Sequence, residues 1–88
     1  MDSHTRADVL KRLNYIDGHL QGVRKMIEED QYCVDVMKQA FAVRRAIEKL
    51  EATMLDGHLH HCVAEAVRAG ETEQVFGELV ELYRLANK

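Results

Sequence analysis

No proline occurs among the 88 residues of this chain, and an apolar repeat at helical spacing runs through its middle. Since proline ends or kinks helices, nothing here forbids a single long helix. The repeat starts near Tyr32 or Cys33 and contains Val34, Met37, Phe41, Ile47, Leu50, Met54, His58 and Cys62. Asp56-Gly57 is a turn dipeptide that could split it. Because the apolar phase continues across the dipeptide, we expect one helix of about 35 residues.

A shorter helix is expected on each side of this long one. The first has an apolar stripe of Leu10, Leu13, Ile16, Leu20, Val23 and Ile27. Ser3 or Thr5 is the expected N-cap, with Asp8 as a capping-box partner, and Glu28-Glu29-Asp30 should end the helix because acids oppose its C-terminal dipole. The last helix should run from Glu73 to Ala86, after a stop at Ala69-Gly70. The chain is therefore predicted to be one all-α domain, residues 1–88, of three helices.

The predicted central helix is too long for the rest of the chain to cover. A helix of about 35 residues is roughly 50 Å long, whereas a compact monomer of this size has a radius of gyration of about 12 Å. Two shorter helices cannot bury the whole apolar stripe. We therefore expect an antiparallel helical dimer or a higher oligomer.

The charges are unevenly distributed. Twelve Lys and Arg against 15 Asp and Glu give a net charge of −3, which argues against indiscriminate nucleic-acid binding. Val9–Ile27 and Val36–Leu50 are nevertheless each locally basic. No apolar run reaches the roughly 18 residues of a membrane span, and no signal-peptide pattern begins the chain, so we expect a cytoplasmic protein. No nucleophile–base pair or phosphate-binding loop is present, which argues against an enzyme.

Cys33, His58 and Cys62 form a candidate metal site. His58 and Cys62 are four residues apart, so they lie on one face of the helix and can share an ion. Cys33 precedes His58 by 25 residues, roughly 38 Å along a straight helix. The three residues therefore cannot meet within one chain. In an antiparallel dimer, Cys33 of one subunit can complete the pair of the other.

The donor types favour a soft metal ion. Thiolates select Cu(I), zinc or iron–sulfur clusters, and structural zinc usually takes four ligands. Only three are evident unless His4, His60 or His61 adds another, so Cu(I) is favoured over zinc. His60 and His61 are expected to face solvent, because neighbouring helical positions point about 100° apart. The alternative to a metal site is a pair of buried, unreactive thiols.

Several sequence blocks resemble the copper-sensing transcriptional repressors of the CsoR type, within the CsoR/RcnR metal-sensor superfamily. They are Arg12–Val23 with Met26, Asp30–Gln39 with its Tyr-Cys-Val-Asp-Val core, and Met54-Leu55 followed by His58-Leu59 and Cys62. The resemblance covers essentially the whole chain. It implies a three-helix subunit, a dimer that assembles to a disc-shaped homotetramer, and Cu(I) bound by Cys33, His58 and Cys62.

The same resemblance implies roles for other residues. Tyr32 and Glu78 match positions that link the metal-bound histidine to the rest of the fold. DNA contacts are expected from the basic residues Arg12, Lys49, Arg44, Arg45, Lys11 and Lys38. Many relatives carry arginine where this chain has Tyr15 and glutamine where it has His19. The expected function is a repressor whose apo oligomer binds double-stranded operator DNA. When Cu(I) binds, the repressor releases the DNA, and genes for copper efflux or homeostasis are expressed.

Two other functions fit the same residues. One is a repressor of the same fold whose thiols respond to persulfides or electrophiles, which would not require His58. The other is a copper-binding buffer that does not bind DNA. Salt-sensitive binding to the promoter of its own operon would separate a repressor from a buffer.

Overall fold

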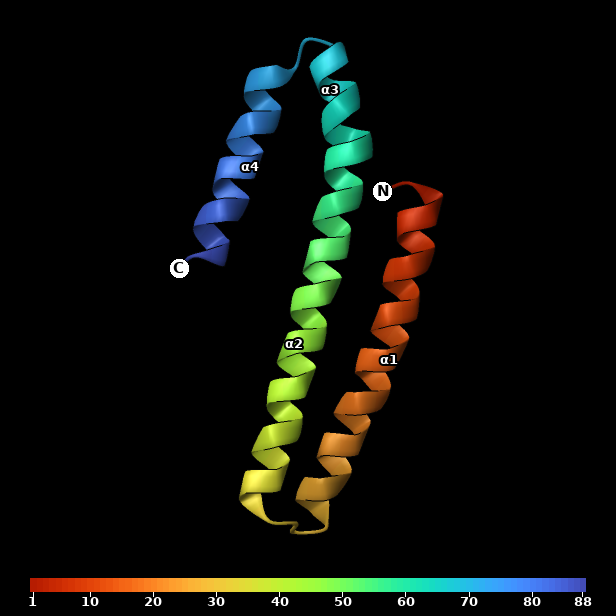
Figure 1. Ribbon diagram of the computed structural model, residues 1–88, viewed down its shortest axis with the longest axis vertical. Helices are drawn as coiled ribbons and strands as arrows, with labels where there is room; N and C mark the ends of the chain where they lie inside the picture. Colours follow the sequence, from red (N-terminus) through yellow and green to blue (C-terminus); the bar gives the residue numbers. More distant parts are fainter.

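The computed structural model describes residues 1–88, and all of its regular elements are helices (Figure 1). Helix α1 spans Ser3–Glu28 and ends at the predicted acidic run. After a short turn the chain returns as α2, Cys33–Gly57, which runs antiparallel to α1 and packs along it. The prediction of a first helix ending near Glu28 and a second beginning near Cys33 is confirmed.

The long central helix is also confirmed. Beyond α2, the π-helical segment η1, His58–Val63, and then α3, Ala64–Arg68, continue in the same direction without a break. The backbone stays right-handed helical at Gly57 and His58, so Asp56-Gly57 is not a turn. The reversal comes at Gly70, whose positive φ of 83° suits glycine, and α4, Thr72–Ala86, then runs back beside the long helix.

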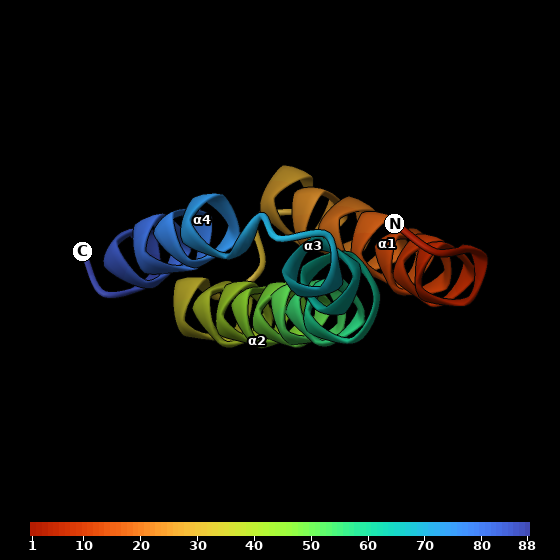
Figure 2. The ribbon, with the colours of Figure 1, turned by 90° about the horizontal axis from the view of Figure 1, so that it is seen from above.

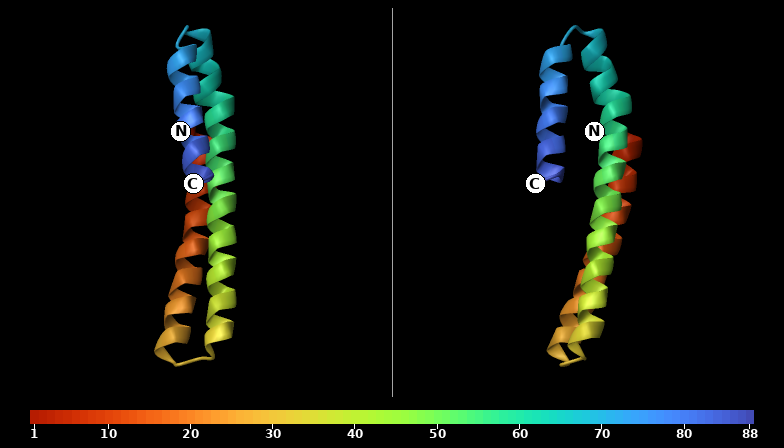
Figure 3. Two further views of the ribbon diagram at one scale, coloured as in Figure 1. Left: turned by 90° about the vertical axis from the view of Figure 1, so that its left-hand side faces the viewer. Right: turned by 60° about the vertical axis from the view of Figure 1, so that its left-hand side comes forward.

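A single subunit is a thin slab. It measures 56 × 29 × 13 Å, and Figures 2 and 3 show α1 and α4 on two sides of the long helix. The radius of gyration is 17.2 Å, against about 12 Å for a compact chain of this length. The accessible surface is 7162 Å², whereas a compact monomer of this mass would expose about 5,300 Å². The subunit therefore lacks a core of ordinary size.

Apolar side chains account for much of this surface. Only seven of the 88 residues are buried, among them Val9 and Ile16 of α1 and Val43 of α2. Most of the predicted stripe on α1 stays exposed, namely Leu10, Leu13, Leu20 and Ile27. Helix α2 therefore covers only part of the apolar face of α1. No helix combines the length and apolar character needed to cross a membrane.

The start of α1 differs from the prediction. Asp2, not Ser3 or Thr5, is the N-cap, and its carboxylate accepts a hydrogen bond from the Thr5 backbone N–H at 3.0 Å. Asp8 forms no capping box and instead pairs with Arg12. Hydrogen bonds from the Thr5 side chain and backbone N–H, with a smaller contribution from the nearby His61, together lower the pKa of Asp2 from 3.8 to about 2.

Gly57 lies at a close approach between α1 and the long helix. Both Gly57 and Thr5 are buried. A Cβ atom added at Gly57 would lie 2.6 Å from Thr5 Cγ2 and 2.9 Å from Thr5 Cβ, closer than real atoms approach. Glycine lowers helix stability by about 1 kcal/mol relative to alanine. Here its lack of a side chain permits the close approach of the two helices.

We expect Gly57→Ala to lower the thermal unfolding midpoint, because the overlap with Thr5 costs about 1–3 kcal/mol and exceeds the gain in helix propensity. Gly77→Ala is the matched control, since a Cβ there meets nothing within 4 Å. It should leave the midpoint unchanged or raise it. Circular dichroism melts at one protein concentration measure both, and a stabilised Gly57→Ala protein would contradict the close approach.

The lowered pKa of Asp2 predicts a pH-dependent contribution to stability. Its ionised form is favoured in the folded state, so the contribution is complete above about pH 4 and is lost as the pH falls towards 2. Asp2→Asn keeps a capping oxygen without the charge, so its melting midpoint should lie below that of the wild type above about pH 4, and the difference should shrink as the pH falls towards 2. Asp2→Ala lacks the cap and should stay less stable throughout. A wild type that exceeds Asp2→Asn equally at pH 2 would contradict this assignment.

Candidate functional site

The three predicted metal ligands lie towards opposite ends of the long helix. Cys33 is the first residue of α2, whereas His58 and Cys62 both belong to η1. Both cysteines are free thiols, and both are exposed in the single subunit. His58 is half-buried. Within one subunit the long helix thus keeps the Cys33 thiol roughly 38 Å from His58, as predicted.

The pair His58 and Cys62 occupies an unusual turn of helix. The six residues of η1 form a π-helix, in which the backbone bonds to the fifth residue along the chain rather than the fourth. Such wide turns are rare and occur often at functional sites. The sequence spacing placed these two donors on one helical face but gave no sign of the π geometry. The two most chemically distinctive side chains of the long helix therefore share its one irregular turn.

No three His, Cys, Asp or Glu side chains of one subunit gather closely enough to hold a metal ion. The chemistry of the donors nevertheless suits a soft ion. The predicted ligands are two accessible thiols and the His58 imidazole. This imidazole makes no hydrogen bond or ion pair in the subunit.

The neighbouring histidines have other partners. His60 Nδ1 donates to the Asp56 carbonyl oxygen at 2.9 Å and lies 3.3 Å from its carboxylate. His61 Nε2 lies 3.5 Å from an Asp2 carboxylate oxygen and so joins η1 to the start of α1. Both rings are largely exposed, which confirms that they face solvent. His4 is exposed as well.

Tyr32 and Glu78 lie on separate elements. Tyr32 is the N-cap of α2, directly before Cys33, and is 67% exposed without a side-chain capping bond. Glu78 is exposed on α4, which packs against α3 through its first turns. No hydrogen bond or ion pair joins either residue to His58 within the subunit. The structure therefore does not bring together the three positions that the family resemblance connects.

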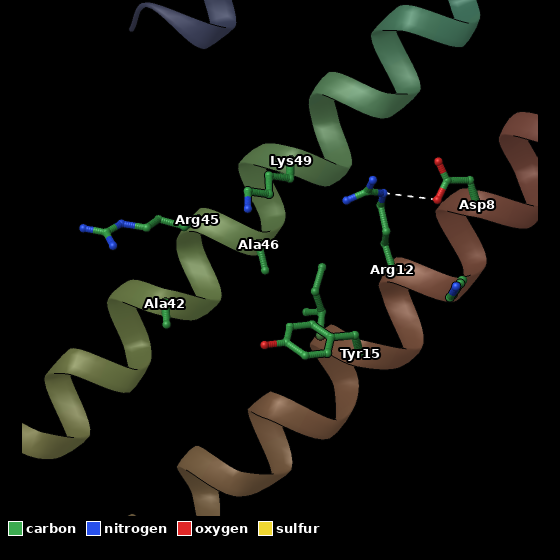
Figure 4. A pocket seen from close by; sticks show the side chains of 9 residues that line it. Asp8, Arg12, Tyr15, Ala42, Arg45, Ala46 and Lys49 are labelled. Carbon is green, nitrogen blue, oxygen red and sulfur yellow. Dashed lines mark hydrogen bonds and ion pairs between the residues drawn. The ribbon is translucent and has the colours of Figure 1, made fainter.

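A basic groove lies between α1 and α2 (Figure 4). It encloses about 510 Å³ and is lined by Asp8, Lys11, Arg12, Tyr15, Ile16, Ala42, Arg45, Ala46 and Lys49. Four bases and one acid give it a net positive charge. Arg12 extends towards α2 near Lys49, whereas Arg45 points outward from α2. Basic side chains from both locally basic segments of the sequence therefore line one groove.

Two of the predicted basic residues do not line the groove. Arg44 lies over the ring of Phe41, with 5.3 Å between its guanidinium carbon and the ring centroid. Lys38 precedes Ala42 by one helical turn and is not among the lining residues. Asp8 was not predicted as part of this surface, but its carboxylate lies 3.2 Å from Arg12 Nε. The spacing of four residues between opposite charges on one helix could have indicated this pair.

Comparison with known proteins gives consistent relatives. The chain is 36% identical over 86 residues to the copper-sensing transcriptional repressor CsoR of Bacillus subtilis (strain 168), covering 98% of this chain and 85% of that protein. It is 43% identical over 72 residues to CsoR of Mycobacterium bovis (strain BCG / Pasteur 1173P2), covering 82% of this chain but only 60% of the mycobacterial protein.

Solved structures agree in fold. The crystal structure of the copper-sensing repressor CsoR with Cu(I) from Geobacillus thermodenitrificans NG80-2 is similar, with a TM-score of 0.93 and 34% identity. The similarity covers all of this chain and 92% of that one. The nickel-responsive transcriptional regulator InrS gives a TM-score of 0.76 at 37% identity, covering 89% of each chain.

The family assignment rests on most of the chain. A family model described as metal-sensitive transcriptional repressor matches residues 5–84, which include most of each helix and the predicted ligands. Its members regulate transcription rather than catalyse a reaction. The chain belongs to the metal-sensitive transcriptional repressor family.

Proposed function

We propose that this protein is a Cu(I)-responsive repressor whose apo oligomer binds operator DNA and whose Cu(I)-bound form releases it. One observation carries the proposal. Two thiols and an imidazole, the donors suited to Cu(I), stand towards opposite ends of one long helix. The chain is also similar over nearly its whole length to repressors described as copper-sensing.

The metal site is proposed to be shared between two subunits. In an antiparallel pair of long helices, the start of one α2 lies beside the η1 of the other. Cys33 of one subunit can then join His58 and Cys62 of its partner. Bound Cu(I) would supply a soft cation that accepts these three donors, and two thiolates with one imidazole satisfy it without a fourth ligand.

The exposed apolar surface supports an oligomer. The unburied stripe of α1 and the apolar residues Phe76, Val80, Leu82 and Leu85 of α4 give a second subunit much to cover. We propose a homodimer that assembles further to a homotetramer, with residues 1–88 of each subunit acting as one domain. A repressor of operator DNA also works where the DNA is, so we propose a cytoplasmic location.

The basic groove is proposed as the DNA surface. Arg12 and Lys49, with Lys11 and Arg45, can neutralise phosphates, and an oligomer repeats the groove once per subunit. Arg44 and Lys38 stand outside the groove and would add supporting charge only. Asp8 lowers the local positive charge and holds Arg12 through its ion pair.

Regulation requires that Cu(I) bind more tightly to the form that does not bind DNA. By linkage, DNA must then weaken Cu(I) binding by the same factor. Couplings of about 1–3 kcal/mol are typical of such systems. We propose that His58 transmits the signal, because a ligating imidazole donates its other N–H to a fixed acceptor. Glu78 is the proposed acceptor and Tyr32 a second partner.

A thiol-based sensor is the second candidate function. Its supporting observation is that Cys33 and Cys62 are both exposed, free thiols. Persulfides or electrophiles could reach either one. Such a sensor needs no imidazole, so His58 distinguishes the two functions.

Cu(I) titration of the apo protein on a labelled fragment of its own promoter tests the proposal. Fluorescence anisotropy should show release, and Cys33→Ala, His58→Ala and Cys62→Ala should each weaken Cu(I) binding at least about a hundredfold and abolish release. His60→Ala and His61→Ala are matched controls that should still respond. If His58→Ala kept full regulation by a persulfide donor, the thiol-based function would replace this one.

Glu78→Ala tests the proposed route of coupling. It should leave Cu(I) affinity nearly unchanged but reduce the copper-induced loss of operator affinity from about 5–150-fold towards none. Glu81→Ala, another exposed acid on α4, is the control and should keep the coupling. Operator affinities measured with and without Cu(I) give the comparison. Full release by the Glu78→Ala protein would exclude this route.

A further inference from the structure

The basic groove ends in a polar bridge between α1 and α2. His19 Nε2 and Gln39 Oε1 are 2.9 Å apart, and theirs is the one side-chain hydrogen bond that joins the two helices. His19 is one turn beyond Tyr15 on α1, and Gln39 is one turn before Ala42 on α2. Because Tyr15 and Ala42 both line the groove, the bridge extends the same face.

The His19 ring is held from two directions. The edge-to-face contact with Tyr15 places the ring centroids 5.9 Å apart at 76°, and Gln39 engages Nε2. Nδ1 is buried and has no hydrogen-bond partner. Because the ring is held in this way, the Gln39 amide cannot readily flip to turn its NH₂ group towards His19 in place of its oxygen.

The bridge determines which atoms Gln39 offers to a ligand. Oε1 accepts, so His19 Nε2 carries the hydrogen and the buried Nδ1 is a bare acceptor. The reverse assignment would bury an N–H donor without an acceptor, which is the rarer and costlier defect. Gln39 itself is exposed, and its amide NH₂ has no partner in the subunit. It therefore presents hydrogen-bond donors outward while its oxygen is turned towards His19.

We propose that Gln39, positioned by His19, reads a base edge of the operator and favours guanine. The inference rests on the proposed function, in which this face binds DNA. In the major groove guanine presents two acceptors, N7 and O6, whereas adenine presents one acceptor and one donor. A free glutamine suits adenine because it offers both an oxygen and an amide group. A glutamine whose oxygen is engaged offers donors only and suits guanine.

The arrangement divides the groove into two functions. The basic side chains around Arg12 and Lys49 contact phosphates, and these contacts fix the position of the protein without selecting a sequence. The His19–Gln39 bridge adds a neutral group of fixed orientation at the end of that charged surface. Affinity and base preference should therefore respond to different substitutions.

Binding of the full apo protein to its own promoter fragment, to single G·C→A·T variants of it and to unrelated DNA tests the inference. Gln39→Ala should lose about 5- to 150-fold in operator affinity and should no longer discriminate at the G·C positions that Gln39 reads. His19→Ala frees the amide to rotate and should instead tolerate adenine there. Neither variant should change binding to unrelated DNA or the slope of log affinity against log salt concentration.

Three controls separate the possible failures. Gln21→Ala, an exposed glutamine of α1 outside the groove, should retain every preference. Arg12→Ala and Lys49→Ala should weaken binding to all DNA and reduce the salt slope by about one for each phosphate that is no longer neutralised. If they do not, this groove is not the DNA surface and the proposed interface fails with the inference. If they do, but Gln39→Ala keeps the base preferences of the wild type, only the role of Gln39 is overturned.

Discussion

One unbroken helix from Cys33 to Arg68 governs the rest of this structure. Its own chain supplies only α1 and α4 to cover it, and only seven residues of the subunit become buried. In the proposed oligomer, packing between subunits supplies much of the remaining apolar burial. Folding and assembly of such an oligomer are coupled. A metal site that needs donors from both ends of the long helix can form only when two subunits pair.

The long helix also carries residues of both proposed sites. Its start and its π-helical turn hold the thiols and the imidazole, and its middle supplies Arg45 and Lys49 to the basic groove. Communication between the two can therefore run along one rigid element and the helices packed on it. Helix α1 is joined to this element through Thr5 against Gly57 and, farther along, through the His19–Gln39 bridge.

Periodicity predicted the three helices because apolar spacing and the absence of proline are local properties. It also predicted that the donors towards the two ends of the helix stay apart. The N-cap was wrong because Ser3, Thr5 and Asp2 are all acceptable caps, and the choice depends on how the first turn docks. The sequence offered Gly57 only as part of a possible turn, because its close approach to Thr5 is a tertiary contact. Arg44 and Arg45 looked equivalent, but about 100° of helical rotation separates them, and only packing shows which one meets the groove.

The π-helical turn has a mechanical consequence for everything after it. A π-turn holds one more residue than the α-turn it replaces, so it offsets the angular position of the following segment by about 100°, the rotation that one residue contributes. The direction in which the chain turns at Gly70 after α3, and hence the side on which α4 returns, depends on whether that extra residue is accommodated. A change between wide and ordinary winding at His58–Val63 would swing the C-terminal arm around the axis while leaving the α1–α2 hairpin in place.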